Sequence, residues 1–434
     1  MTVTGTVTRR DLLRLMGVGA GAFGIGGLVA CAPSADNDDD DSGGTSETGD
    51  AAQDFSFASW SLADDASKAE IQKLMDAFAS ANDVSVSGVP YAYNDYLNQL
   101  TLQVQGGQFT GAAQLDIAWL AALSALGKLR DLGSVAEGVD YTESGLLSGQ
   151  VDGVQYGLPW TTAAIGLIAN REHLDQVGVT EPPATLADFE AVLTELKGAG
   201  FIPYAASTKV AQLKDILIWM ETFGSPLIDG DQVTIGDDAS IEAVTWYKKL
   251  YDQGLIAPDV ERLDARNLFS QGRAAMYDDA IVGKAFVVGE SPDPELLSKL
   301  TALPRPVLAA GDTPRAVQWG HAIVVVDGEG ADTAAEFAKF VTSDEELVLG
   351  YFEALGLPPT TDTALASDTV QNDPFTAEFG ERITATATPN PFWRFPQYAQ
   401  METAVAEQVQ AVLTGASSPA DAMRAAGEAV QGLV

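Results

Sequence analysis

One stretch predicts the fold: FSFASWSLADDASKAEIQKLMDAFASANDVSVSGVPYAYNDYLNQLTLQVQGG, residues 55–107. Residues 55–60 alternate apolar and small side chains, which is typical of a strand. Apolar residues then recur at helical spacing within residues 66–79, at Ile71, Leu74, Met75 and Phe78. A second strand at 85–90 and a second helix at 95–105 follow, and Gly106-Gly107 ends that helix. The stretch therefore predicts alternating strands and helices.

The alternation continues along the chain. Residues 115–120 form a nearly continuous apolar run, as expected for a strand buried on both faces. Thr185 with Asp188, and Thr333 with Glu336, predict capping boxes at the starts of two helices, and Ser418-Pro419 predicts the start of the last. Further strands are predicted at 163–169, 274–277 and 322–326, and further helices at 213–223, 241–251 and 265–271. This order predicts an α/β fold with mostly parallel sheets covered on both sides.

Residues 1–31 are predicted to be a targeting segment. Arg9-Arg10 lies in a basic start, and residues 15–30 carry no charge but are too few for a membrane span. Leu28-Val29-Ala30-Cys31 resembles a bacterial lipobox, and the arginine pair resembles a twin-arginine export signal. The resemblance implies that Cys31 is lipidated and anchors the chain to the outer face of the cytoplasmic membrane. The export route, twin-arginine or general secretory, stays open.

Residues 32–54 are acidic and small, with Asp38 to Asp41 in a row, and are predicted to be a flexible linker. The remaining residues are too many for one core and predict two lobes. The formal net charge of −37 excludes nucleic acid as a partner. One cysteine and two histidines, His173 and His321, leave little for metal or nucleophilic chemistry, so no cofactor and no enzymatic activity are expected.

Six segments in order resemble the family of bacterial extracellular solute-binding proteins that includes maltose-binding and other sugar-binding proteins. They are Tyr156–Trp160 with the strand Ile165–Asn170; Asn170–Leu174 with 178–183 and Thr185–Phe189; Phe269–Met276; Ala335–Phe340 with Ser343–Glu346; Gly356–Thr360; and Val412–Ala422. The chain departs from the family at Tyr277-Asp278-Asp279-Ala280, where many relatives have a G-x-W motif. Ligand contacts there cannot be transferred from better-known members.

The resemblance implies a monomeric protein with two lobes, a hinge between them and a ligand cleft at their interface. The first lobe is predicted to take 55–162 and 320–356, and the second to take 163–319 and 357–434. Such proteins close around a small-molecule solute, a mono- or oligosaccharide in the sugar-binding members, and present it to the permease of an ABC importer.

A sugar site needs aromatic platforms and hydrogen-bonding side chains, and in open α/β sheets ligands lie at the carboxyl ends of strands. Trp160, beside Thr161, is the favoured single contact because it follows the family's first crossing motif. The helical positions of Trp219 and Trp246 instead favour the core. The predicted ligand-binding residues are Trp60, Asp65, Trp119, Trp160, Thr161, Tyr277, Asp278, Asp279, Trp319 and Trp393.

Three alternatives stay open at this point. Asp278 and Asp279 could suggest a retaining glycosidase, but adjacent strand residues point to opposite faces. The same cleft could serve a surface lipoprotein that senses its ligand. The acidic surplus would also suit a cationic solute such as a polyamine.

Overall fold

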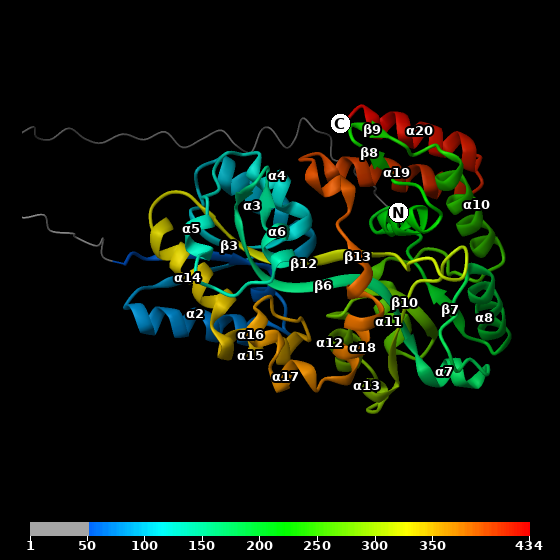
Figure 1. Ribbon diagram of the computed structural model, residues 1–434, viewed down its shortest axis with the longest axis horizontal. Coiled ribbons are helices and arrows are strands. Elements are labelled where there is room, and N and C mark those ends of the chain that lie inside the picture. The colour runs from blue at the N-terminus through cyan, green and yellow to red at the C-terminus, as the bar shows by residue number, and fades with distance from the viewer. Residues whose placement is uncertain (1–51) are drawn as a thin grey trace, which may run out of the picture. The chain divides into compact units, whose positions relative to one another are not determined.

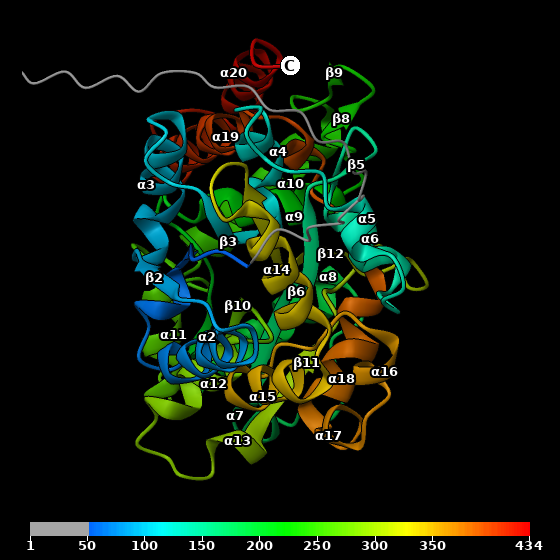
Figure 2. The ribbon, with the colours of Figure 1, turned by 90° about the vertical axis from the view of Figure 1, so that its left-hand side faces the viewer.

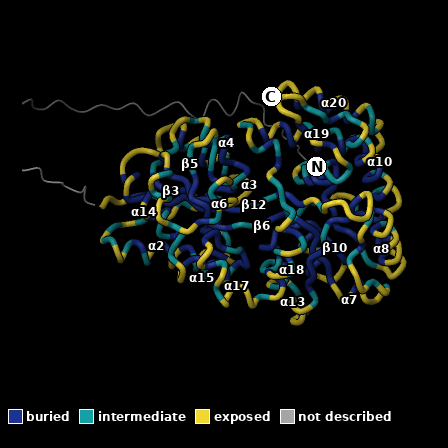
Figure 3. The backbone as a smooth tube through the Cα atoms, in the orientation of Figure 1, coloured by how far each residue is buried: buried dark blue, intermediate teal, exposed yellow. Residues whose placement is uncertain are grey.

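Two long strands organise the computed structural model, which describes residues 52–434. Strands β6 (Gly157–Asn170) and β12 (Ala316–Val326) pair antiparallel and run across the middle of the molecule (Figure 1). Both are almost entirely buried, as Figure 3 shows along β6. The predicted targeting segment, Cys31 and most of the predicted linker lie outside the described residues.

The two ends of the sheet are parallel. The strand order is β2-β1-β3-β12-β6-β10-β7, with β11 paired to β6 and β13 paired to β12. One end, which we call the β3 side, holds β1 (Phe55–Ser59), β2 (Val86–Pro90) and β3 (Gly111–Asp116), all parallel. The other end, the β10 side, holds β7 (Ile202–Ala205), β10 (Ala274–Ala280) and β11 (Leu300–Leu303), which run in one direction. Within this sheet, the antiparallel pairings all involve β6 or β12.

The registers show where the carboxyl ends of these strands lie. On the β3 side, Asp116 at the end of β3 faces His321, which in turn faces Thr161 of β6. On the β10 side, Ala280 at the end of β10 faces Ile165 of β6. The two sets of carboxyl ends therefore approach each other over the middle of β6. Ligands of α/β proteins bind at such strand ends.

Helices cover both sides of the sheet (Figures 1 and 2). The β3 side carries α2 (Lys68–Asn82), α3 (Tyr93–Gln105), α4 (Leu120–Ser124), α5 (Gly133–Ala136), α6 (Glu143–Ser148), α14 (Ala331–Ser343) and α15 (Glu345–Leu355). The β10 side carries α7 (Arg171–Gln176), α8 (Leu186–Gly198), α9 (Ile216–Thr222), α10 (Asp238–Asp252), α11 (Arg262–Ser270), α12 (Gly283–Gly289), α13 (Leu296–Lys299), α19 (Tyr398–Leu413) and α20 (Pro419–Gln431). The chain between α15 and α19 forms α16 (Asp362–Leu365), α17 (Asp368–Gln371), α18 (Pro374–Arg382) and β13 (Ala387–Thr388). Two small hairpins complete the described chain: β4 (Gln150–Val151) with β5 (Val154–Gln155), and β8 (Ile228–Asp229) with β9 (Gln232–Val233).

The hydrophobic core consists of two clusters, one on each face of the sheet. Neighbouring residues of one strand alternate between them: Leu167 belongs to the first cluster and Ile168 to the second. Met276 and Tyr277 of β10 divide in the same way. This follows from the period of two along a strand. Each cluster includes residues from both the β3 side and the β10 side.

Several predicted elements are confirmed. The capping box of Thr185 and Asp188 begins α8, and Ser418 caps α20 with Pro419 in its first turn. Other details were wrong. The run 115–120 is not one strand, because the Asp116 side chain accepts a hydrogen bond from the Ala118 amide and ends β3 there. A short helical turn, η2 (Ile117–Trp119), and then α4 follow it.

The predicted capping box of Thr333 and Glu336 was also wrong. Helix α14 begins at Ala331, after Gly330 in the left-handed conformation at φ 75°. The Thr333 hydroxyl instead accepts a hydrogen bond from the Gln53 amide, and the Gly330 amide donates to the Gln53 side chain. The last residues of the predicted linker are thus bound to the β3 side.

None of the helices within residues 52–434 combines the length and the apolar character that a membrane crossing requires. By its internal contacts, the described chain is one unit. The lobe boundaries, 55–162 with 320–356 and 163–319 with 357–434, stay a prediction.

Candidate functional site

The carboxyl ends of the two strand sets bring together a group of aromatic and charged side chains, which we call the central site. Its β3-side members lie at or just after the ends of β1, β2 and β3, or on β12. Its β10-side members lie in the turn η3 (Leu213–Asp215) after β7, at the start of α11, or in the last segments of the chain. The central site comprises Trp60, Tyr93, Asp116, Trp119 and Trp319 on the β3 side, and Lys214, Asp215, Arg262, Trp393 and Glu402 on the β10 side.

The β3-side rings pack edge to face. Trp60 lies in a short helical turn, η1 (Trp60–Leu62), directly after β1, and Tyr93 opens α3 after β2. The Trp60 ring centroid lies 5.5 Å from that of Tyr93 and 5.4 Å from that of Trp119. Trp60 and Trp119 are each 8% exposed, whereas Tyr93 is 41% exposed. Tyr93 therefore presents the most open aromatic surface of the group.

Asp116 is held by three donors. Tyr93 Oη lies 2.8 Å from Asp116 Oδ2, and Trp319 Nε1 lies 2.7 Å from the same oxygen. The Ala118 amide nitrogen lies 2.9 Å from Oδ1. Burial raises the pKa of Asp116, and these hydrogen bonds together with the charge of Lys214 oppose that shift.

The β10 side supplies a chain of ion pairs. Arg262 Nη2 lies 2.6 Å from Asp215 Oδ2, and Lys214 Nζ lies 3.4 Å from Glu402 Oε2. The other Glu402 oxygen accepts a hydrogen bond from Trp393 Nε1 at 2.8 Å, which orients the indole. Lys214 and Asp215 lie in the turn η3 (Leu213–Asp215), whereas Glu402 lies on α19.

The two sides are electrostatically coupled. Lys214 lowers the pKa of Asp116, and Arg262 lowers that of Tyr93, although burial and Asp116 raise the Tyr93 pKa more strongly. Burial lowers the pKa of Lys214, but Glu402, Asp215 and Asp116 together raise it above its usual value. The charged groups of each side thus act on titratable groups of the other.

Solvent reaches part of the central site. Lys214 keeps 34% of its side-chain surface exposed, and Tyr93 keeps 41% of its residue surface. Nevertheless desolvation by surrounding protein is the largest influence on the pKa of each.

Four of the predicted tryptophans meet at or beside this site: Trp60, Trp119, Trp319 and Trp393. Thr161 lies next to it on β6, where its hydroxyl accepts a hydrogen bond from the His321 amide at 3.1 Å. Trp319 lies within β12, not before it as predicted, and faces Ala163 near the middle of β6.

Trp160 and Tyr277 do not join this group, because the strand alternation places them in the second core cluster. Trp160 is 1% exposed and stacks on Tyr351 with ring centroids 4.3 Å apart. The strand predicted at 163–169 begins earlier, at Gly157, so Trp160 lies inside the 14-residue strand β6. Tyr277 is fully buried against Phe269.

Asp278 and Asp279 are buried and ion-paired on opposite faces of β10. Asp278 Oδ1 lies 2.6 Å from Arg305 Nη2, and its other oxygen accepts a hydrogen bond from Tyr204. Asp279 Oδ2 lies 2.7 Å from Arg266 Nε, and Asp279 also contacts Arg262. Neither carboxylate is free for a solute in this arrangement. Asp65 is exposed beyond the turn that follows β1.

The sequence reasoning missed Tyr93, Asp116, Lys214, Asp215, Arg262 and Glu402. The rule of carboxyl strand ends could have found Asp116, because it ends an apolar run. It could also have found Tyr93, which follows the second predicted strand. Lys214, Arg262 and Glu402 carried no local signal, since their partners are distant in sequence.

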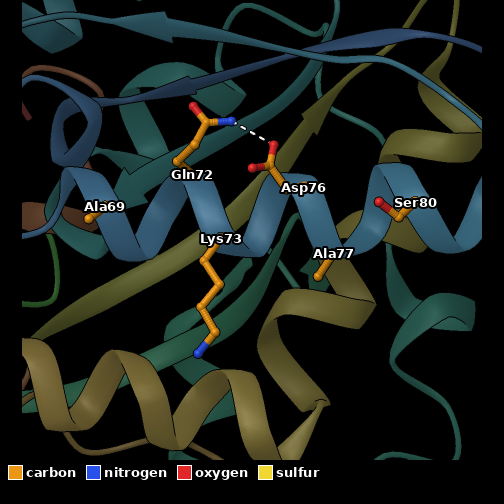
Figure 4. Close-up of a pocket in the computed structure, with 6 residues that line it drawn as sticks. All are labelled: Ala69, Gln72, Lys73, Asp76, Ala77 and Ser80. Carbon is orange, nitrogen blue, oxygen red and sulfur yellow. Dashed lines mark hydrogen bonds between the residues drawn. The ribbon is translucent and has the colours of Figure 1, made fainter.

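Two hollows lie elsewhere. Figure 4 shows an open groove along α2, lined by Ala69, Gln72, Lys73, Asp76, Ala77 and Ser80, where Gln72 bonds to Asp76 at 2.8 Å. A cavity of about 200 Å³ is lined by Arg171, Leu174, Val179, Thr180, Glu181, Pro182, Thr301, Leu303 and Arg382. Neither includes a residue of the central site. Within residues 52–434, no group of three or more His, Cys, Asp or Glu side chains is arranged to hold a metal ion.

Glu221, near the end of α9, makes stability depend on pH. Burial raises the pKa of Glu221 to about 7, against the opposing charge of Arg315. The folded state thus holds this proton more tightly than the unfolded chain, where glutamate titrates near about 4.3. The stability that the bound proton contributes is complete below about pH 4.3, the pKa in the unfolded chain. It is lost as the pH rises through about 7, the pKa in the folded state. We expect Glu221→Gln to gain about 1 to 2 kcal/mol over the parent at pH 8, since partial exposure reduces the full effect.

Urea unfolding of the parent and of Glu221→Gln at pH 5 and pH 8 checks this prediction. The stability difference should grow between the two pH values. The exposed Glu195→Gln on α8 serves as the control and should show no such growth. A Glu221→Gln difference that is equal at both pH values would contradict the prediction.

The model of the bacterial extracellular solute-binding protein family matches residues 73–377. Relatives in Brucella abortus (strain 2308) and Brucella suis biovar 1 (strain 1330), whose names propose that they are binding proteins, are 24% identical over 224 residues. The match covers 48% of this chain and 52% of each relative. The chain thus spans about half the length of the curated relatives it matches.

Solved structures share the fold at low identity. The GacH receptor of Streptomyces glaucescens, solved unliganded and with acarbose, has a TM-score of 0.79 at 22% identity and covers 88% of this chain and 98% of that one. Maltose-bound MalE3 of Thermotoga maritima has a TM-score of 0.77 at 20% identity, over 88% and 100%. A ribitol-bound ABC transporter solute-binding protein of Agrobacterium radiobacter K84 has a TM-score of 0.74 at 19% identity, over 89% and 99%. The predicted fold class, a two-lobed α/β solute-binding fold, is confirmed.

Proposed function

Because the chain belongs to the bacterial extracellular solute-binding protein family, we propose that it captures a carbohydrate at the central site and delivers it to the permease of an ABC importer. The observation that carries the proposal is the meeting of aromatic rings and hydrogen-bonding side chains where two sets of strand ends face each other. Solved relatives of the same fold hold acarbose, maltose and ribitol.

The chemistry of the central site suits a polyhydroxylated solute. The exposed ring of Tyr93 offers an apolar face, and the partly exposed Trp319 and Trp393 add further aromatic area. Lys214 and Arg262 can donate hydrogen bonds to hydroxyl oxygens, and Asp215 can accept them from hydroxyl groups. Sugars need this combination of ring faces and polar side chains.

The proposed mechanism is closure around the solute. The two lobes would pivot where β6 and β12 pass between them, with the β3-side and β10-side members of the central site on opposite walls. A solute that contacts both walls stabilises the closed form by its differential affinity for that form. The permease would then distinguish the loaded protein from the empty one.

The buried carboxylates support binding rather than hydrolysis. A retaining glycosidase needs two carboxyl groups about 5 Å apart that face one sugar. Asp278 and Asp279 instead lie on opposite faces of a strand and pair with different arginines, Arg305 and Arg266. A protein that senses the same solute for a membrane partner would use the same site, and transport assays with the permease distinguish that role.

A thermal-shift screen of the purified protein tests the proposal. Its panel is mono- and oligosaccharides, polyols, amino acids and polyamines. A solute that binds only the folded state raises Tm with the logarithm of its concentration over Kd. We expect a shift with one carbohydrate class. A shift with amino acids alone would contradict the carbohydrate assignment.

Membrane attachment is proposed to depend on Cys31. Two acyl chains on this cysteine would hold the chain at the membrane, because each buried methylene contributes about 0.8 kcal/mol. We expect Cys31→Ser to move the protein from the membrane fraction to the soluble fraction, as fractionation and immunoblotting of expressing cells would show. A Ser42→Ala variant should stay in the membrane fraction. Retention of Cys31→Ser in the membrane would contradict the anchor.

A further inference from the structure

Within the described residues, 52–434, one carboxylate of the central site makes no ion pair. The others are each paired: Asp215 with Arg262 at 2.6 Å, and Glu402 with Lys214 at 3.4 Å. Asp116 contacts only neutral donors, namely Tyr93 Oη, Trp319 Nε1 and the Ala118 amide. It is 2% exposed, so bulk water compensates little of its charge.

The donors around Asp116 are arranged for the ionised form. All three groups donate, two to Oδ2 and one to Oδ1, and hydrogen bonds donated to a carboxylate favour its charged form. The wider set of buried charges has the same imbalance. Five carboxylates (Asp116, Asp215, Asp278, Asp279 and Glu402) meet four cations (Lys214, Arg262, Arg266 and Arg305). The excess is one negative charge, and Asp116 is the carboxylate of this set that makes no ion pair within residues 52–434, although the charge of Lys214 acts on it.

Asp116 acts on the surface that a solute would touch. Tyr93 and Trp319 both donate to it and both keep part of their surface exposed to solvent. A hydrogen bond from a ring substituent to an anion polarises the ring and makes its face more negative. The two rings thereby extend the negative charge of the buried carboxylate toward the cleft.

We propose that the solute is a carbohydrate bearing a protonated amine, which sits over the rings of Tyr93 and Trp319 with Asp116 as its counter-charge. This inference rests on the proposed function and adds the charge of the solute to it. An ammonium group at a ring face gains cation–π attraction and the field of the carboxylate behind the ring, whereas a hydroxyl group gains neither. An anionic sugar would be repelled by the same field.

The test compares matched solutes on matched variants by calorimetric titration of the full chain. Each amino sugar is paired with the parent sugar that has a hydroxyl group at the same carbon: glucosamine with glucose, and β-1,4-glucosamine oligosaccharides with cello-oligosaccharides of equal length. We expect the amine form to bind about tenfold more tightly than its parent. Asp116→Asn keeps the shape and one acceptor oxygen but removes the charge, and we expect this preference to fall to about twofold or less.

Two further variants separate the counter-charge from a structural role. Tyr93→Phe keeps the ring but removes the hydrogen bond to Asp116, and should lower the amine preference to an intermediate value. Asp175→Asn removes the same charge from an exposed position on α7 and should leave the preference unchanged. If Asp116 only holds the fold, its Asn variant will weaken amine and parent sugar equally, and this outcome overturns the inference.

The outcomes also separate this inference from the proposed function. Tight binding of neutral sugars with no amine preference overturns the inference and leaves the proposed function intact. Binding of spermidine with no binding of any sugar overturns both, because the solute would then be a polyamine. A lower affinity for the amine at high salt, with the parent sugar unaffected, is the further result that the inference predicts.

Discussion

Replacement of Tyr93 by alanine is expected to weaken binding of the solute about 30- to 100-fold. Tyr93 is the most exposed ring of the central site, at 41%, and it also holds Asp116 through its hydroxyl group. Truncation removes the ring face against which we place the solute, and such aromatic contacts are worth about 2 to 3 kcal/mol at binding sites. Calorimetric titration with the solute from the thermal-shift screen would measure the loss.

The variant should still fold, because Tyr93 is in the first turn of α3 and alanine favours helices, but the lost hydrogen bond to Asp116 will lower its stability. Leu102→Ala on the same helix is the matched control, since Leu102 is 62% exposed and lies outside the central site. It should bind like the parent. An unchanged affinity of Tyr93→Ala for the solute would show that Tyr93 is not part of the binding site.

The largest loss of stability is expected for Arg305→Met, at about 3 kcal/mol. Arg305 is 3% exposed, pairs with Asp278 at 2.6 Å and lies with its guanidinium carbon 4.3 Å from the ring centroid of Trp219. Methionine would fill part of the volume but would leave Asp278 buried with Tyr204 as its remaining partner. The expected loss of stability lies at the low end of the range for a broken buried ion pair. Arg305 Nε and Nη1 have no hydrogen-bond partner in residues 52–434, and their removal relieves the cost of burying them.

Urea unfolding of the purified variants would measure this loss. Adding Asp278→Asn to Arg305→Met should recover part of the stability, since no uncompensated charge then remains. Arg424→Met is the control, because Arg424 pairs with Asp421 at 2.8 Å with side chains 63% and 67% exposed, and its loss should cost less than about 1 kcal/mol. A stability for Arg305→Met equal to that of the parent would show that the pair contributes nothing.

The elements of the fold could be predicted from local patterns. The period of apolar residues located α2 because its buried residues Ile71, Leu74, Met75 and Phe78 lie on one helical face. The capping box at Thr185 located the start of α8, because both hydrogen bonds form within four residues. Such signals lie within one element and need no knowledge of the rest of the chain.

The candidate site could be predicted only in part. The rule of strand ends indicated the region in which Trp60, Trp119, Trp319 and Trp393 gather. The face of a strand depends on its register, and a shift of one residue moves a side chain to the other side, as for Trp160. The partners that define the site are also far apart in sequence: 203 positions separate Asp116 from Trp319. No local pattern encodes such a contact.

The position of the bound solute is tested most directly by a crystal structure of the protein with the sugar that gives the largest thermal shift. We predict a sugar ring against Tyr93 and Trp319, with hydrogen bonds from Lys214 or Arg262 on the opposite wall. A sugar bound in the groove along α2, in the cavity beside Arg171, or against one wall of the central site alone would contradict the account.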